Sequence, residues 1–121
     1  MTDQGEALKE RTKRFALDVL EILKLLSNDE PAQTIKRQLA KSTTSVAANY
    51  RSARRARSHA EFTARISLVA EEADETRFWL GLLADLKLVG SEHLQRLQKG
   101  SRRTYCHIFS VYSHRAAQIS I

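Results

Sequence analysis

The side chains best suited to chemistry in this sequence are the bases of its second quarter. Residues 36 to 57 contain no acid and seven bases: Lys36, Arg37, Lys41, Arg51, Arg54, Arg55 and Arg57. On a helix, residues 51, 54 and 55 share one face, which Arg57 extends. Because the planar guanidinium group binds phosphate oxygens well, this stretch favours a phosphate-bearing ligand.

A second basic group, Lys99, Arg102 and Arg103, lies near the C-terminus. The net charge of +6 raises the local concentration of polyanions, but many basic proteins of this size bind no nucleic acid. The residues that we expect to contact nucleic acid are Lys41, Arg54, Arg55, Arg57, Arg102 and Arg103.

An acidic cluster supplies the opposite charge and consists of Glu71, Glu72, Asp74 and Glu75. Residues 71, 74 and 75 share a helix face, as a general acid/base pair could. Ion pairing with arginines of a neighbouring helix is the stronger interpretation, and under it Arg51 pairs with one of these carboxylates. Four acids cannot neutralise seven bases, so some arginines should stay free.

Other catalytic or metal-binding patterns are weak. A di-iron bundle needs Glu-x-x-His motifs, and none of the histidines follows a glutamate at that spacing. His107 and His114 could share a face, but zinc needs four ligands. Cys106 and His107 are sequence neighbours that point in different directions on a helix, so Cys106 is expected to be a small buried residue. We therefore predict no catalytic residue, no metal, no cofactor and no enzymatic activity.

The composition indicates one helical, cytoplasmic domain. The chain has 121 residues, of which 42% are hydrophobic, and this is enough to bury a core without metal or disulfides. A single cysteine fits a reducing compartment. Four glycines and one proline favour long helices. No apolar run approaches the roughly 20 residues of a membrane span, and the polar N-terminus lacks a signal-peptide core.

Apolar residues recur at spacings of three and four in four segments, which predicts an all-α, antiparallel up-down four-helix bundle over residues 1–121. The expected helices span residues 4–26, 31–57, 58–90 and 91–115. About ten N-terminal and five C-terminal residues are expected to fray. Ser58 and Glu61 form a capping box in which each side chain accepts from the other's N–H, and Gly90 is the expected left-handed helix end.

The third segment carries a second apolar stripe, Phe78, Leu82 and Leu86, beside its core face. A monomer rarely leaves such a stripe exposed, which favours a homo-oligomer, specifically a ring. Asn49 falls on the inward face of the second segment, where its amide must find a partner.

Several motifs together resemble the bacterial four-helix-bundle family that includes proteins encoded in intervening sequences of 23S ribosomal RNA genes. The motifs are Ser45–Ala53, which contains the block Ser-Val-Ala-Ala-Asn-Tyr-Arg, followed by Arg55–Ser58, Ala60–Phe62, Glu71–Thr76 and Trp79–Leu80. The chain is also similar to the accessory variability protein of diversity-generating retroelements. The commoner subgroup reads Pro-Ala-Asn-Ile-Ala-Glu-Gly, and here Asn49 matches its asparagine, but Tyr50–Ala53 replace the residues that follow it.

The resemblance implies an up-down bundle that assembles as a homopentamer with a basic surface. In the retroelement branch it also implies binding to reverse transcriptase and RNA. The positions that match the family's motif residues, with structural roles implied, are Asn49, Arg51, Glu71, Glu72 and Glu75.

The sequence thus predicts a non-enzymatic, homo-oligomeric bundle that binds nucleic acid, with RNA favoured over DNA, through phosphates. The alternative is a structural or protein-interaction module with no nucleic-acid ligand, in which the bases close ion pairs between helices. The salt dependence of binding distinguishes the two hypotheses, because phosphate binding weakens steeply with ionic strength whereas binding to a hydrophobic protein partner barely changes.

Overall fold

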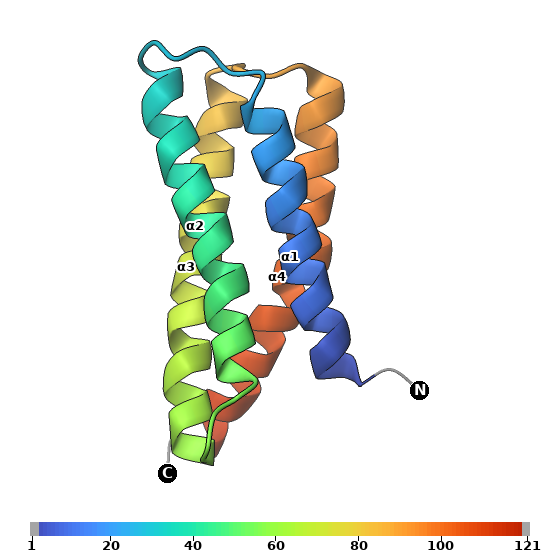
Figure 1. Ribbon diagram of the computed structural model, residues 1–121, viewed down its shortest axis with the longest axis vertical. Helices are drawn as coiled ribbons and strands as arrows, with labels where there is room; N and C mark the ends of the chain where they lie inside the picture. The colour runs from blue at the N-terminus through green and yellow to red at the C-terminus, as the bar shows by residue number, and fades with distance from the viewer. Residues whose placement is uncertain (1–2, 120–121) are drawn as a thin grey trace.

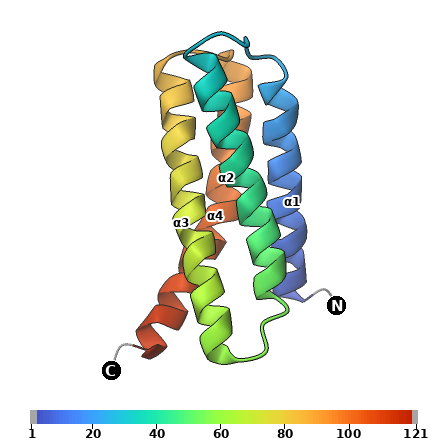
Figure 2. The same ribbon diagram turned by 60° about the vertical axis from the view of Figure 1, so that its left-hand side comes forward.

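The structure, a computed structural model, describes residues 3–119, with side chains to residue 115. In this range the chain forms an all-α four-helix bundle without strands (Figures 1 and 2). Its helices are α1 (Gln4–Leu23), α2 (Ala32–Ala53), α3 (His59–Asp85) and α4 (Ser91–Ile119). Successive helices run antiparallel and pack side by side, and α1 also contacts α4. Within these residues, none of the four helices combines the length and the hydropathy that a membrane-spanning segment requires.

The core is built from the helix faces that the apolar spacing predicts. In α1, Phe15, Val19 and Ile22 are buried. The corresponding residues of the other helices are also buried: Ile35, Leu39, Ser42 and Val46, then Ile66, Val69, Ala73, Thr76, Leu80 and Leu83, then Leu97, Ser101, Tyr105 and Ile108. A helix with one apolar stripe must bury it against its neighbours, so these four stripes define the bundle.

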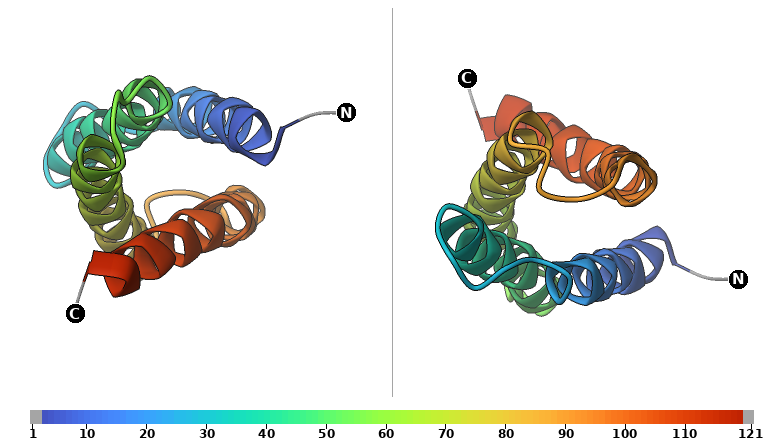
Figure 3. Two further views of the ribbon diagram at one scale, coloured as in Figure 1. Left: turned by 90° about the horizontal axis from the view of Figure 1, so that it is seen from below. Right: turned by 90° about the horizontal axis from the view of Figure 1, so that it is seen from above.

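The bundle is open on the side between its first and last helices. Seen along its length, the ribbon is a horseshoe whose ends are the N-terminal part of α1 and α4 (Figure 3). The C-terminal half of α4 leans toward the start of α3, where Arg115 lies 5.1 Å from the Phe62 ring centroid. The lean leaves part of α1 without a helix facing it.

Two helix ends differ from the sequence prediction. Helix α2 ends at Ala53 rather than Arg57, because Ser58 has the extended backbone of a helix N-cap and the chain must leave the helix before it. Helix α3 ends at Asp85, and the residue with positive φ is Lys87 (54°), not Gly90. The early turn lets Leu88 and Val89 pack against the core.

Two local predictions are corrected in part or in full. Ser58 does accept the Glu61 N–H at 3.0 Å, but the Glu61 carboxylate accepts the Arg57 N–H at 2.9 Å instead of that of Ser58. Cys106 is exposed, because Tyr105 and Ile108 take the inward positions of α4.

Helix α1 already begins at Gln4, capped by Asp3, in the stretch expected to fray. The last expected frayed positions, Ser120 and Ile121, lie outside the described residues.

Candidate nucleic-acid interface

Arg54, one of the predicted phosphate contacts, is engaged within the chain. Its Nη2 donates to Asp3 Oδ2 at 2.6 Å, and Glu6 Oε2 lies 3.9 Å away. The hydrogen bond from Arg54 lowers the pKa of Asp3, and the same bond raises the pKa of Arg54. Asp3 also accepts the Gly5 N–H at 2.8 Å, so Arg54 supports the carboxylate that caps α1. It is therefore a weaker candidate for phosphate contact than its neighbours.

Arg55, Arg57 and Lys41 remain exposed, and within the described residues their side chains form no ion pair. Arg55 and Arg57 lie in the turn between α2 and α3, where the Arg57 N–H holds the Glu61 carboxylate. That hydrogen bond is the main cause of the lowered pKa of Glu61. Arg57 is thus fixed at its backbone while its guanidinium group projects into solvent.

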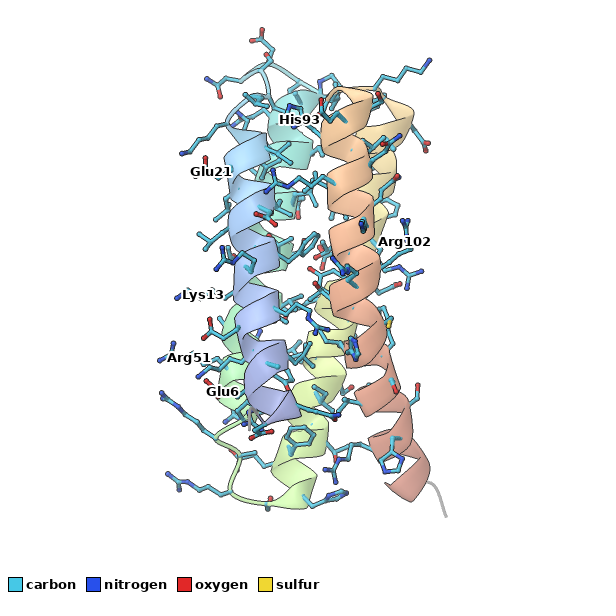
Figure 4. All side chains as sticks on the ribbon, turned by 90° about the vertical axis from the view of Figure 1, so that its right-hand side faces the viewer. Glu6, Lys13, Glu21, Arg51, His93 and Arg102 are labelled. Atoms are coloured by element: carbon cyan, nitrogen blue, oxygen red, sulfur yellow. The ribbon has the colours of Figure 1, made fainter. Side chains whose placement is uncertain are left out.

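The acidic cluster of α3 does not neutralise the bases of α2. Among the described residues, no arginine or lysine of the stretch 36–57 forms an ion pair with residues 71–75. The predicted pairing of Arg51 with these carboxylates is wrong, because Arg51 lies on the side of α2 that faces α1, beside Lys9 and Lys13. Figure 4 shows Arg51 and Lys13 projecting on the same side of α1, away from α4.

Asn49 is the residue of α2 that contacts the acidic cluster. Its half-buried amide donates from Nδ2 to Glu72 Oε1 at 2.7 Å and so joins α2 to α3. Further along the same pair of helices, the buried hydroxyls of Ser42 and Thr76 hydrogen bond at 2.8 Å. Glu71 and Glu75 point away from this contact and are exposed.

We predict that Asn49→Ala lowers stability by about 1.5 kcal/mol, because it removes a charge-assisted hydrogen bond. Asn49→Asp is expected to cost about twice as much, since two carboxylates then face each other at a half-buried site. Thermal unfolding followed by circular dichroism measures both, with Lys41→Gln as the control, at an exposed position of the same helix that lines none of the grooves described below. Unchanged melting of both variants would contradict a structural role for Asn49.

A basic groove lies between α1 and α4, on the open side of the bundle. Its volume is about 550 Å³. The cationic groups that line it are Arg11 and Arg14 from α1 and Arg103 from α4, and the imidazole ring of His107 lies beside them. Phe15 and the buried Thr104 lie between these walls, and Asp18 is the acid that lines it. Because Asp18 pairs with Arg96 at 3.3 Å, it offsets little of this charge.

A second hollow of about 440 Å³ continues this groove past the start of α1. Arg11 and His107 line both hollows, so the two form one surface, here called the α1–α4 groove. The second part adds Arg54 and Arg115 and the half-buried ring of Phe62. Arg11 Nη1 donates to the Arg103 carbonyl oxygen at 3.4 Å, which ties the two walls together.

Gly100 lets the groove walls approach each other at its floor. A Cβ atom at this position would lie 2.8 Å from Phe15 Cδ1, closer than carbon atoms pack. Phe15 is itself held in place by an edge-on contact with Tyr105 at 5.3 Å. The floor of the groove is therefore tightly packed where its walls carry arginines.

The two C-terminal arginines named from the sequence point to different places. Arg103 lines the α1–α4 groove, whereas Arg102 lies on the α3 side of α4, near Arg77 and Phe109. In Figure 4 Arg102 projects from the side of α4 turned away from α1. The structure thus brings Arg103 together with residues of α1 and leaves Arg102 apart.

Arg11, Arg14 and His107 were not predicted from the sequence as neighbours of Arg103 in a binding site. Their spacing was visible: residues 11 and 14 are one turn apart, as are residues 103 and 107. First and last helices of an up-down bundle are neighbours, so these two pairs could have been joined. Among the described residues, no group of three or more His, Cys, Asp or Glu could hold a metal ion.

The fold and the groove define a small helical bundle with a basic, concave surface. Residues 7–107 match the family model described as 23S rRNA-intervening sequence protein. This chain belongs to that family.

A crystal structure agrees with this assignment. It is of a protein of unknown function from the S23 ribosomal protein family of Bacteroides thetaiotaomicron VPI-5482, 28% identical in sequence. The match covers 87% of this chain and 97% of that one, with a TM-score of 0.78. Among curated proteins, none matches this sequence. The similarity to the retroelement accessory protein stays a prediction.

Proposed function

We propose that this protein binds RNA through the α1–α4 groove and acts as a homo-oligomer in the cytoplasm. The observation that carries the proposal is the gathering of Arg11, Arg14 and Arg103 on both walls of one groove. Arginines on two walls can hold a phosphodiester backbone from both sides, and each contact is charge-assisted. Arg55 and Arg57 lie beyond the same end of the bundle and extend the basic surface. Lys41 and Arg102, named from the sequence, remain candidates outside the groove.

The groove suits a single strand better than a duplex. Phe62 is half-buried at its lower end with the Arg115 guanidinium 5.1 Å from its ring centroid, and an unstacked base can stack on the plane of a guanidinium held in this way. Single-stranded loops are also the usual targets of RNA-binding proteins. The description of the family refers to ribosomal RNA, which favours RNA over DNA. We assign no catalytic residue, because the groups gathered here are arginines suited to contact rather than to proton transfer.

The test is binding of a labelled single-stranded RNA, measured by fluorescence anisotropy at two salt concentrations. Three phosphate contacts predict that log affinity falls with log salt with a slope of about −2. The same sequence as a duplex, and a single-stranded DNA, serve as comparisons and should bind more weakly. Absence of binding by the parent protein at low salt would retire the proposal.

A protein-interaction role is the second candidate, and a specific observation favours it. Phe78, Leu68 and Leu86 are exposed on the outer face of α3, at 58%, 45% and 47% of their surface. Large apolar side chains gathered on one exposed face are typical of an interface. A partner bound through them would be nearly indifferent to salt, unlike RNA.

A further inference from the structure

The outer face of α3 carries an ordered pattern of acids and apolar residues. Positions at spacings of three and four form one line on the outer side of the helix, here called the α3 stripe, and Leu82 at its inner edge also packs against the core. Its members are Leu68, Glu71, Glu75, Phe78, Leu82 and Leu86. The acids come first along the chain and most of the apolar residues follow. Leu82 is half-buried, whereas Phe78 is 58% exposed and stands edge-on against Trp79 at 5.0 Å.

A different face carries a groove with the complementary pattern. Between α1 and α2 lies a hollow of about 350 Å³, here called the α1–α2 groove. Small side chains of α2, among them Ala47 and Ala48, leave room for it, and Leu17 and Leu20 of α1 form its apolar wall. Leu17 is 48% exposed although it lies in a hollow.

The rim of the α1–α2 groove is basic. It carries Lys9, Lys13 and Arg51 against the single acid Glu10. Lys9 is paired with Glu6 at 3.0 Å, but Lys13 and Arg51 form no ion pair within the described residues. Glu71 and Glu75 likewise form none there. Two bases on one face thus correspond to two acids on another.

The two surfaces also agree in direction and spacing. Helices α1 and α3 run the same way along the bundle, since α2 between them runs back (Figures 1 and 2). In α1, Lys13 precedes Leu20 by seven residues, and in α3 Glu71 precedes Phe78 and Glu75 precedes Leu82 by the same interval. Seven helical residues span about 10 Å. When two copies lie with parallel axes, one placement therefore sets the acids of the α3 stripe against the bases of the α1–α2 groove and the apolar residues of the stripe against those of the groove.

We propose that the α3 stripe of one copy docks into the α1–α2 groove of the next copy, a contact that rests on the proposed homo-oligomer. Glu71 and Glu75 face Lys13 and Arg51, while Phe78 and Leu82 cover Leu17 and Leu20 of the neighbour. A helix lying in a groove is a common way for proteins to recognise helices. Its occupant is a second copy because this chain itself carries both the matching charges and the matching spacing.

Because the two surfaces differ, the contact is head-to-tail. Each copy offers one stripe and one groove, so the assembly grows in one rotational sense and closes into a ring if the rotation allows. The α1–α4 groove is not part of this contact and stays open to RNA in every copy. Repeating that groove around a ring multiplies weak phosphate contacts through effective concentration.

The experiment uses two single variants and their mixture. Phe78→Glu places a carboxylate on the apolar part of the α3 stripe, and Leu17→Glu places one on the apolar wall of the α1–α2 groove. Both positions are exposed, so folding should be unaffected. Light scattering coupled to size exclusion should give an assembly for the parent protein and 13.8 kDa monomers for each variant. Mixed together, the variants keep one intact stripe and one intact groove, so they should form a dimer of twice that mass and nothing larger.

Leu25→Glu is the matched control, because Leu25 is 63% exposed but lies outside both surfaces, and it should assemble like the parent. Two variants that both keep the parent's mass would overturn the docking while leaving the homo-oligomer in place. Two monomeric variants that form no dimer on mixing would overturn the head-to-tail pairing. A parent protein of 13.8 kDa would overturn the docking and the oligomer together, while RNA binding by that monomer would preserve the α1–α4 groove.

Discussion

Replacing Arg11, Arg14 and Arg103 together by glutamine is expected to weaken RNA binding by about three orders of magnitude. Each hydrogen bond to a charged phosphate contributes about 1.5 kcal/mol or more, and about 1.4 kcal/mol corresponds to a factor of ten. The slope of log affinity against log salt should become shallower by about 0.7 for each arginine–phosphate pair that the substitutions remove. The weakening should be similar for RNAs of different sequence, because phosphate contacts carry no base information.

The control removes the same charge at the other end of the bundle. Lys24, Arg37 and Lys87 are exposed there and far from the α1–α4 groove, and their combined change to glutamine should leave most of the affinity. Equal weakening in the two triple variants would mean that net charge alone drives binding, without a defined site. Circular dichroism of both variants checks that the fold is kept.

A second comparison separates the groove from the arginines predicted from the sequence. Arg55→Gln with Arg57→Gln removes two exposed bases at the α2–α3 turn and should cost less than the groove variant. Arg54→Gln should mainly loosen the start of α1, because Arg54 supports the capping Asp3. If the turn variant binds RNA more weakly than the groove variant, the binding site belongs to the α2–α3 turn.

The helix faces could be predicted from the sequence, because burial of an apolar stripe is a local requirement repeated every three to four residues. Phe15, Leu39, Ile66 and Tyr105 all occupy the positions that this spacing gives them. Helix ends were predicted less well. Whether the chain leaves the helix at Lys87 or at Gly90 depends on how Leu88 and Val89 reach the core, which is a tertiary effect.

The site was harder to predict than the fold because its partners are distant in sequence. Arg54 meets Asp3 across 51 positions, and Arg11 meets Arg103 across 92. The run of bases suggested that Arg54 is free to bind phosphate and that Arg51 pairs with the acids of α3, but Arg54 pairs with Asp3 and Arg51 lies beside Lys13. Charges that gather from two helices leave no such run, and they emerge only when the helix order around the bundle is known.

Substituting Gly100 is expected to destabilise the fold, whereas the same change at Gly81 should stabilise it. Both glycines lie inside helices, where alanine is favoured by about 1 kcal/mol. At Gly81 nothing lies within 4 Å of a new Cβ atom, so Gly81→Ala should gain most of that amount. At Gly100 the new atom meets the Phe15 ring at 2.8 Å and 2.9 Å, and overpacking of this kind costs about 1–3 kcal/mol.

Substitution by leucine is expected to enlarge the difference in stability between variants at Gly81 and variants at Gly100. Gly81→Leu stays in solvent, but Gly100→Leu must displace Phe15, so its cost should be about 3 kcal/mol. Phe15 cannot move freely, since it is 3% exposed and packs edge-on against Tyr105. Chemical denaturation of the four variants measures these differences, and equal stability of the two leucine variants would contradict the close approach of α1 and α4.

The Gly100 variants also connect packing to binding. Displacing Phe15 changes the floor between Arg14 and Arg103, so Gly100→Ala should weaken RNA binding under conditions in which the protein is still fully folded. Gly81→Ala lies between α3 and α4 beside Arg102, outside the α1–α4 groove, and should bind like the parent. If Gly100→Ala keeps full affinity, the arginines act as independent charges, and the shape of the groove contributes nothing to recognition.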